Sequence, residues 1–279
     1  MYGCFHSVGI PDKPILAVVE RVAAVGYPAI ELNAETLPWA PAHVSPGTTR
    51  ETRQGIIDAC RSSNITIPAV GAHLLMVSAD KAERQAAIDY VNGCIDLAVD
   101  VNSPVVHILS GPQATEGTYD DGWRWFAEAV EKTTDYAKRH GVELAVEAIA
   151  GHLFHSIDDY KRLFSDLGGV PFKINFDPSH LEVQGEDPAR LVEELGEHIV
   201  HVHLKDGLGR YPDFSFPPLD EGTIDFAGLI PALARSGYDG ALSIEYEAQV
   251  FGWKQDEQTI LDHGIAFLRR FGIQMRNDT

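Results

Sequence analysis

The chain has 279 residues, a length that suits one large globular domain with a full core. Its 22 Lys and Arg against 41 Asp and Glu give a net charge of −19, which repels phosphate backbones and disfavours a nucleic-acid partner. Hydrophobic residues make up 44% and charged residues 23%, as in soluble proteins, and no apolar run of about 18 residues predicts a membrane span.

The cysteine content and the N-terminal stretch both predict a cytoplasmic protein. Cys4, Cys60 and Cys94 have no CxxC spacing and are too few for a disulfide framework, which indicates a reducing compartment. The first ten residues, MYGCFHSVGI, contain no basic n-region and no long apolar segment, so we expect no secretory signal peptide.

Short β-rich runs alternate with longer amphipathic runs along the whole chain. We predict strands at 3–7, 29–33, 65–73, 104–110, 142–148, 172–177, 199–205 and 241–247. We predict helices near 13–25, 49–62, 80–99, 121–140, 156–167, 187–196, 225–236 and 255–271. Eight strands alternating with eight helices predict an α/β fold, a (β/α)8 TIM barrel that forms a single domain over 1–279.

Helix boundary signals agree with this segmentation. Ser156 stands at a helix N-cap position, and Asp187 is followed by a first-turn proline. Three glycines follow apolar helical patterns, where a left-handed C-cap favours glycine: Gly26, Gly141 and Gly237. The longest irregular segments, 34–48 and 206–224, both follow strands, so we expect them at the carboxyl end of the barrel, where loops build the active site.

The alternation of side chains along the last four strands directs polar residues to the barrel axis. Near the strand ends, the inward positions are Glu147, Asp177, His203 and Glu245. Converging buried carboxylates need a counter-charge, and a divalent metal bound by these four residues supplies it. The mixed oxygen and nitrogen ligands favour Mn²⁺, with Co²⁺, Mg²⁺ or Fe²⁺ as alternatives. The competing interpretation is ion pairing with the inward lysines Lys173 and Lys205.

Further inward polar residues accompany this set. Glu247 continues the inward face of the last strand, and other inward positions are His6, Glu31, His73 and His107. Taken singly, each suits a packed core residue, but together they indicate a substrate pocket, so we predict that His6, His73, His107 and Lys205 bind substrate. Aromatic residues of the loops shape this pocket or simply pack: Trp39, Trp123, Phe214, Phe216 and Trp253. His180 follows Asp177 by three residues in DPSH, within reach of the metal or of a substrate oxygen.

Four segments resemble the xylose isomerase-like barrel superfamily, in particular its sugar isomerase and epimerase branch: VEAIAGH, NFDPSH, HVHLKD and SIEYE. The resemblance covers essentially the whole chain and implies a metal held by Glu147, Asp177, His203 and Glu245, with His180 touching substrate. It also implies a substrate-holding arginine shortly after strand seven, for which Arg210 is the nearest match, and a homo-oligomer. The stretch PPLDEGTIDF is similar to the family's turn before helix seven, with its first glycine replaced.

A metal that polarises a carbonyl acidifies the adjacent C–H, and a carboxylate can then remove that proton to give an enediolate. Glu147 and Glu245, from strands five and eight, are the predicted catalytic acid/base pair. We therefore predict a metal-dependent isomerase or epimerase acting on a keto-sugar or polyol, with an inosose dehydratase-like lyase as the main alternative.

Two other classes fit the chain less well. An AP-endonuclease-like barrel is opposed by the charge of −19 and by the missing Asp-x-His element after strand seven, although His73 and His107 suit its additional metals. A non-catalytic sugar-binding barrel is opposed by the presence of both candidate acid/base glutamates, Glu147 and Glu245.

Overall fold

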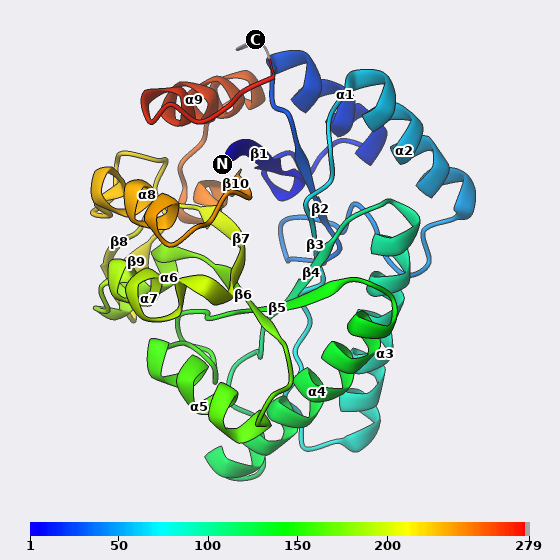
Figure 1. The fold of residues 1–279 in the computed structure, drawn as a ribbon, viewed down its shortest axis with the longest axis vertical. Coiled ribbons are helices and arrows are strands. Elements are labelled where there is room, and N and C mark those ends of the chain that lie inside the picture. Colours follow the sequence, from blue (N-terminus) through cyan, green and yellow to red (C-terminus); the bar gives the residue numbers. More distant parts are fainter. Residues whose placement is uncertain (277–279) are drawn as a thin grey trace.

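The computed structural model describes residues 1–276, in which eight parallel strands close into a barrel (Figure 1). Around the barrel, the strands follow the order β1-β10-β7-β6-β5-β4-β3-β2. Their bounds are β1 Tyr2–His6, β2 Ile30–Asn33, β3 Ala69–Gly71, β4 Val105–Ile108, β5 Glu143–Glu147, β6 Lys173–Phe176, β7 Ile199–Leu204 and β10 Ala241–Ile244. Apart from Tyr2, every residue of these eight barrel strands lies within a predicted strand, and the predicted single-domain (β/α)8 barrel is confirmed.

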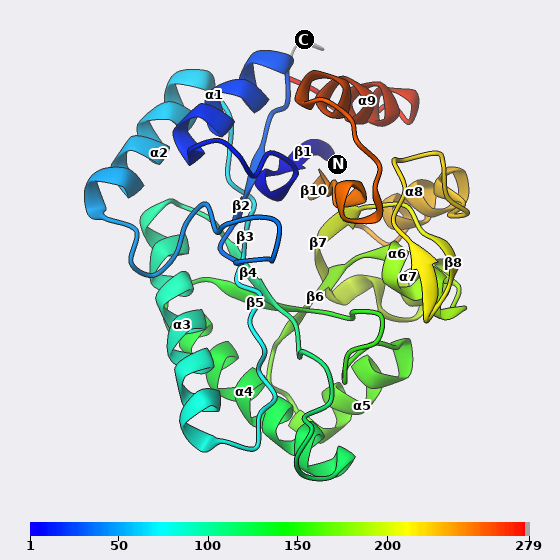
Figure 2. The same ribbon diagram turned by 180° about the vertical axis from the view of Figure 1, so that it is seen from behind.

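Helices surround the barrel on its outside (Figures 1 and 2). The predicted helices correspond to α1 Ile15–Val25, α2 Arg50–Ser63, α3 Lys81–Asp100, α4 Tyr119–Arg139, α5 Ile157–Leu167, α7 Pro188–Leu195, α8 Phe226–Arg235 and α9 Glu257–Arg270. Single turns of 3-10 helix occur at η1 Ser7–Gly9, η2 Gly196–His198 and η3 Ala248–Phe251. In the described part of the chain, no helix is both long enough and apolar enough to cross a membrane.

Two elements were not predicted from the sequence. Helix α6 Pro178–Gln184 follows β6 directly, with Asp177 as its N-cap and Pro178 in its first turn. The segment 206–224 contains a small antiparallel hairpin, β8 Leu208–Arg210 and β9 Asp213–Ser215. Both are too short to produce a hydrophobic periodicity that stands out from a loop.

The helix caps follow the predicted signals. The side chain of Ser156 accepts a hydrogen bond from Asp159 N, and that of Asp187 accepts one from Ala189 N. Backbone φ angles are positive at the three predicted glycines: 118° at Gly26, 71° at Gly141 and 92° at Gly237. Outward strand residues such as Val202 and Leu204 are fully buried under the helices.

The inside of the barrel is layered by side-chain type. Small and aliphatic residues fill its amino-terminal end, including the cluster Ala69, Val105 and Ala145. The next layer is polar and contains the buried residues Glu31, His107, His201 and His203. Gly71 in β3 leaves room for this layer, since a Cβ there would lie 2.9 Å from Cε1 of His107.

Candidate metal centre

The four predicted metal ligands meet at the carboxyl ends of their strands. Glu147 ends β5, Asp177 follows β6, His203 lies in β7 and Glu245 directly follows β10. All four are buried, and one potential ligand atom from each lies within 4.8 Å of the others. Nδ1 of His203 is 3.5 Å from Oε1 of Glu147 and 3.4 Å from Oε2 of Glu245. The structure therefore brings the predicted set together.

Asp177 shows that these residues fit a divalent cation. Its Oδ1 accepts a hydrogen bond from Ser179 N at 2.8 Å, which fixes the carboxylate. Its Oδ2 is buried without a hydrogen-bond partner in residues 1–276, although Nζ of Lys205 lies 3.0 Å away. Burial raises the pKa of Asp177 to about 6. The charge of Lys205 acts to lower this pKa, but the neighbouring carboxylates of Glu147 and Glu245 act to raise it. An unsatisfied carboxylate oxygen among oxygen and imidazole ligands suits a hard divalent metal ion.

Glu147 and Glu245 each direct one oxygen to His203 and the other to separate partners. Oε2 of Glu147 accepts a hydrogen bond from Nδ2 of Asn175 at 2.8 Å and lies 3.2 Å from Nε2 of His73. Oε1 of Glu245 lies 3.0 Å from Nδ1 of His6. Burial alone would raise the pKa of both glutamates, but the positive charge of His203 and the surrounding hydrogen bonds hold both pKa values well below the usual range. Both side chains are therefore ionised bases at neutral pH.

Lys205 is a buried cation beside this cluster. Its Nζ donates to Oε2 of Glu245 at 2.6 Å and to Oε2 of Glu247 at 2.8 Å, and it lies 4.6 Å from the ring centre of Phe216. The ion-pair interpretation from the sequence therefore applies to Lys205. It does not apply to Lys173, which is the first residue of β6 and lies on the amino-terminal side of the cluster. One lysine compensates several carboxylates only in part, and Oδ2 of Asp177 has this ion pair but no hydrogen bond among residues 1–276.

The loop after β7 is fixed by Asp206, the residue that directly follows Lys205. The carboxylate of the next residue, Asp206, accepts four backbone N–H groups at 2.9–3.3 Å, from Gly207, Asp220, Gly222 and Ile224. A carboxylate that accepts several backbone N–H bonds closes the loop around itself. The HVHLKD segment therefore supplies the candidate ligand His203, the cation Lys205 and the residue that fixes the following loop, Asp206.

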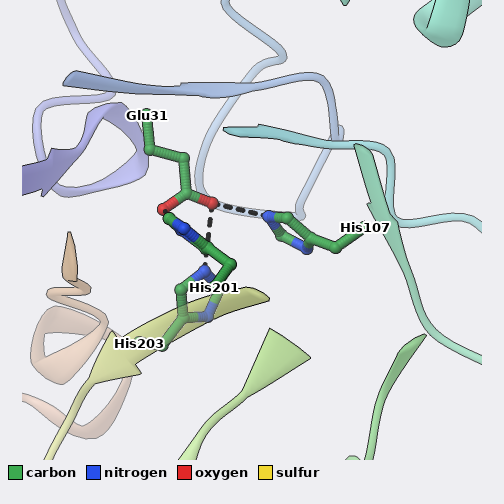
Figure 3. Close-up of side chains that lie close together, drawn as sticks. All are labelled: Glu31, His107, His201 and His203. Atoms are coloured by element: carbon green, nitrogen blue, oxygen red, sulfur yellow. Dashed lines mark hydrogen bonds and ion pairs between the residues drawn. The ribbon is translucent and has the colours of Figure 1, made fainter. Parts of the chain in front are cut away.

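A second polar cluster centres on Glu31 and shares His203 with the four candidate ligands (Figure 3). Oε1 of Glu31 is 2.6 Å from Nε2 of His107 and 3.0 Å from Nε2 of His203, and Oε2 is 2.8 Å from Nε2 of His201. Burial would raise the pKa of Glu31, but the charges of the surrounding histidines hold it well below the usual range. Glu31 is therefore an ionised acceptor at the barrel axis.

Two histidines connect this cluster to the barrel mouth. Nδ1 of His107 is 2.8 Å from Nε2 of His73, and Nδ1 of His73 is 3.2 Å from Oε2 of Glu35. Burial lowers the pKa of His107 to about 3, so this ring is neutral. Burial would also lower the pKa of His73, but hydrogen bonds with Glu147 and Glu35 raise it to about 10.

A cavity of about 190 Å³ opens above the ligands, between the β-strand ends. Four predicted substrate-binding residues line it: His6, His73, His180 and Lys205. The fifth, His107, is fully buried behind His73. The volume of the cavity is below the ~300–1,000 Å³ of clefts that bind drug-sized ligands, which suits a compact substrate.

The structure does not place Arg210 with the other predicted substrate residues. Arg210 lies in β8, its side chain is 60% exposed, and its Nη1 donates to the backbone carbonyl of Glu182 and lies 3.4 Å from the carboxylate of Glu182. The unpredicted hairpin is the reason, because it turns this residue away from the barrel axis. Trp123 likewise packs in the helix layer, where it stacks on Phe154.

Several cavity residues were missed or left without a role at the sequence level. Glu35 and His152 line the cavity from loops, and Glu247 was placed inward without a function. His152 closes the VEAIAGH segment, which was noticed only for Glu147. Strand alternation identifies inward residues only as far as the strand continues, so residues beyond the strand ends carry no such signal. Phe216 is buried and packs behind the cavity lining, with its ring 4.9 Å from that of His180.

The fold and this arrangement define a class of protein, a (β/α)8 barrel with carboxylate and imidazole groups converging at the carboxyl ends of its strands. Comparison with known proteins gives the family. The chain belongs to the xylose isomerase-like TIM barrel family, whose model matches residues 19–271. The resemblance drawn from the four sequence segments is thereby confirmed.

Its relatives include sugar epimerases and dehydratases. The putative L-ribulose-5-phosphate 3-epimerase SgbU of Escherichia coli K12 is 29% identical over 262 residues, which cover 86% of this chain and 88% of SgbU. An inosose dehydratase of Lacticaseibacillus casei is 27% identical over 145 residues, 46% of this chain and 48% of that enzyme. The crystal structure of the IOLI protein with a bound zinc atom aligns with a TM-score of 0.76 and 14% identity over 97% of this chain and 99% of that one, a likeness of fold.

Proposed function

We propose that this protein is a divalent-metal-dependent isomerase or epimerase that acts on a keto-sugar or polyol. The observation that carries the proposal is the paired arrangement of Glu147 and Glu245, two buried carboxylates that converge on His203 from different strands. Each also has its own outer partner, His73 for Glu147 and His6 for Glu245. Two independently held bases beside one site suit proton removal on one face and proton return on the other.

Glu147, Asp177, His203 and Glu245 would hold the metal ion, most simply Mn²⁺, with Co²⁺, Mg²⁺ or Fe²⁺ as alternatives. When bound, such an ion supplies Lewis-acid polarisation of a substrate carbonyl and stabilises negative charge that develops on its oxygen. The zinc atom in the related IOLI structure and the unsatisfied Oδ2 of Asp177 support this assignment.

The protein's own part in the reaction is proton transfer at carbon. The ionised carboxylate of one glutamate takes the proton from the carbon next to the carbonyl, and the C–H electron pair forms an enediolate. In epimerisation the other glutamate takes up a proton from solvent and returns it to the same carbon from the opposite face, while the first glutamate keeps the proton that it removed. In aldose–ketose isomerisation one glutamate alone can move the proton between neighbouring carbons.

The substrate would be held by the polar groups of the cavity. His6, His73, His180 and Lys205 offer hydrogen bonds to hydroxyl and carbonyl oxygens, and His107 supports His73 from behind. Burial and the charge of Lys205 hold the pKa of His180 well below its usual range, so His180 is a neutral partner. The carboxylates of Glu35 and Glu247 share this cavity, which favours an uncharged substrate over a phosphorylated one.

The proposal is tested by incubating the purified protein with candidate ketoses and inososes in D2O with Mn²⁺. Products are analysed by mass spectrometry, and by NMR after the metal has been removed. Solvent deuterium at the carbon beside the carbonyl, in a product of unchanged elemental composition apart from that deuterium, supports isomerase or epimerase activity. A product that has lost water contradicts it.

A lyase is the second candidate, and one observation favours it. Nζ of Lys205 donates to Glu245 at 2.6 Å and lies 3.4 Å from Nε2 of His180, so a potential proton donor stands beside a potential base. In a dehydration, Glu147 or Glu245 would remove the proton, and the ammonium of Lys205 would protonate the departing hydroxyl. The similarity to inosose dehydratase agrees with this alternative over about half of the chain.

A further inference from the structure

Glu31 is a buried charged group for which the proposed chemistry has no use. It is fully buried in β2, and it lies within hydrogen-bond distance of three imidazoles, those of His107, His201 and His203 (Figure 3). A buried carboxylate is costly unless its partners satisfy it, so its position at the axis requires an explanation.

We propose that Glu31 is a positioning residue that fixes the tautomers of two histidines, His203 at the metal centre and His107 behind the cavity. The proposal rests on the metal centre described under the proposed function. It assigns Nδ1 of His203 as the atom that binds the metal, and it makes Glu31 the group that holds the hydrogen on the other ring nitrogen, Nε2.

The geometry at His203 supports the first assignment. An ionised carboxylate only accepts hydrogen bonds, so Nε2 of His203, 3.0 Å from Oε1 of Glu31, carries the hydrogen. Nδ1 of His203 faces the carboxylates of Glu147 and Glu245, at 3.5 Å and 3.4 Å, so a divalent ion held by both carboxylates would replace the hydrogen of Nδ1 and take its lone pair. Carboxylates that orient metal-binding histidines through the other ring nitrogen are common at metal sites.

The geometry at His107 supports the second assignment. Nε2 of His107 lies 2.6 Å from Oε1 of Glu31 and therefore also carries its hydrogen. Nδ1 of His107 is then an acceptor, and it receives Nε2–H of His73 at 2.8 Å. Glu31 thereby sets the orientation of His73, a cavity residue that also contacts Glu147 at 3.2 Å.

Glu31 is better explained as this acceptor than as a ligand of a second metal in the same cluster. Its Oε1 already receives two N–H groups, and its Oε2 lies 2.8 Å from Nε2 of His201, all at hydrogen-bond lengths. His201 provides a matched control, because it contacts the same carboxylate through the oxygen that does not face His203.

The test compares Glu31→Gln with His201→Gln in the full-length protein. In Glu31→Gln, the amide can present an N–H donor to His203 or His107, which opposes their tautomers. We expect the Mn²⁺ dissociation constant, measured by titration calorimetry, to rise by about 10- to 100-fold in Glu31→Gln. It should stay close to the wild-type value in His201→Gln. Circular dichroism of the metal-free proteins reports whether each variant folds.

A direct readout of the tautomer is available in the wild-type protein. Long-range ¹H–¹⁵N correlation spectra of the Zn²⁺-loaded, ¹⁵N-histidine-labelled protein should show Nδ1 of His203 bound to metal and Nε2 protonated. His203 bound through Nε2 would overturn the proposal even if Glu31→Gln failed to fold. Glu31→Asp, which keeps an acceptor, should bind Mn²⁺ more tightly than Glu31→Gln.

The outcomes separate this inference from the proposed function. A wild-type protein that binds no divalent metal defeats the metal centre itself. If wild type and Glu31→Gln bind the metal with the same dissociation constant, Glu31 does not have the proposed role, and the proposed metal centre still stands. Loss of one metal ion per chain in Glu31→Gln, with the remaining ion bound as before, would instead make Glu31 a ligand of a second metal and overturn the proposal.

Discussion

Replacement of Lys205 by methionine isolates the electrostatics of the candidate metal centre. The ammonium lies 2.6 Å from Glu245, 2.8 Å from Glu247 and 3.0 Å from Asp177, and the lysine is only 3% exposed. Methionine keeps the apolar length of the side chain but removes the charge, so these carboxylates lose a buried partner. Removal of one member of a buried ion pair costs roughly 3–5 kcal/mol.

This cost translates into a measurable change in melting temperature. One kcal/mol shifts the Tm of a large domain by about 2–4 °C, so the metal-free Lys205→Met protein should melt on the order of 10 °C below wild type. A bound divalent ion replaces the missing charge. We therefore expect Mn²⁺ to raise the Tm of Lys205→Met by more than it raises that of wild type.

Differential scanning calorimetry in EDTA and in Mn²⁺ measures both effects. Lys132→Met is the control, since Lys132 pairs with Glu128 on the surface of α4 and such pairs contribute about 0–1 kcal/mol. The reasoning is refuted if Lys205→Met and wild type melt together in EDTA. It is also refuted if Mn²⁺ stabilises the variant no more than it stabilises wild type.

Three further predictions follow from the same groups. Glu245→Gln should lower kcat by about 10²- to 10⁴-fold while circular dichroism stays unchanged, and near-normal turnover would remove Glu245 from proton transfer. EDTA should abolish activity and Mn²⁺ or Co²⁺ should restore it, whereas full activity in a preparation shown by elemental analysis to contain no metal would refute the metal centre. Contacts with Glu147 and Glu35 raise the pKa of His73 to about 10 against the opposing effect of burial, so its stabilising contribution is complete below pH 6.5 and is lost as the pH rises toward 10. In urea unfolding of the metal-free proteins, His73→Gln should therefore be more destabilised relative to wild type at pH 6.5 than at pH 10, and a constant difference would contradict this.

The fold was predictable because each repeat of the barrel carries its own signal. Alternation in HVHLK separates Val202 and Leu204, buried under the helices, from His201 and His203 at the axis. Capping residues such as Ser156 mark helix starts independently of hydrophobicity. Strand β3 shows the limit, since 65–73 was predicted and only Ala69–Gly71 pairs as a strand. An apolar run in the sequence does not show which of its residues form backbone hydrogen bonds with the neighbouring strands.

The site was predictable where it depends on strand faces and unpredictable where it depends on loops. The four ligands occupy strand ends whose order around the barrel follows from the chain order. Arg210 was predicted to bind substrate because it follows strand seven closely in the sequence, but the direction of its side chain depends on the β8–β9 hairpin. The contacts of Glu31 with His107 and His203 join strands far apart in sequence, and only the closed barrel shows that they converge.

Gly71 has a consequence for how such a barrel can change during evolution. A methyl group at this position would press on the ring of His107, which is bonded to both Glu31 and His73. A substitution to alanine would thus disturb the hydrogen-bonded histidines beside a cavity that Gly71 itself does not line. Selection for function at the barrel mouth would therefore also act against a methyl group at position 71 in β3, although Gly71 is not one of the residues that line the cavity.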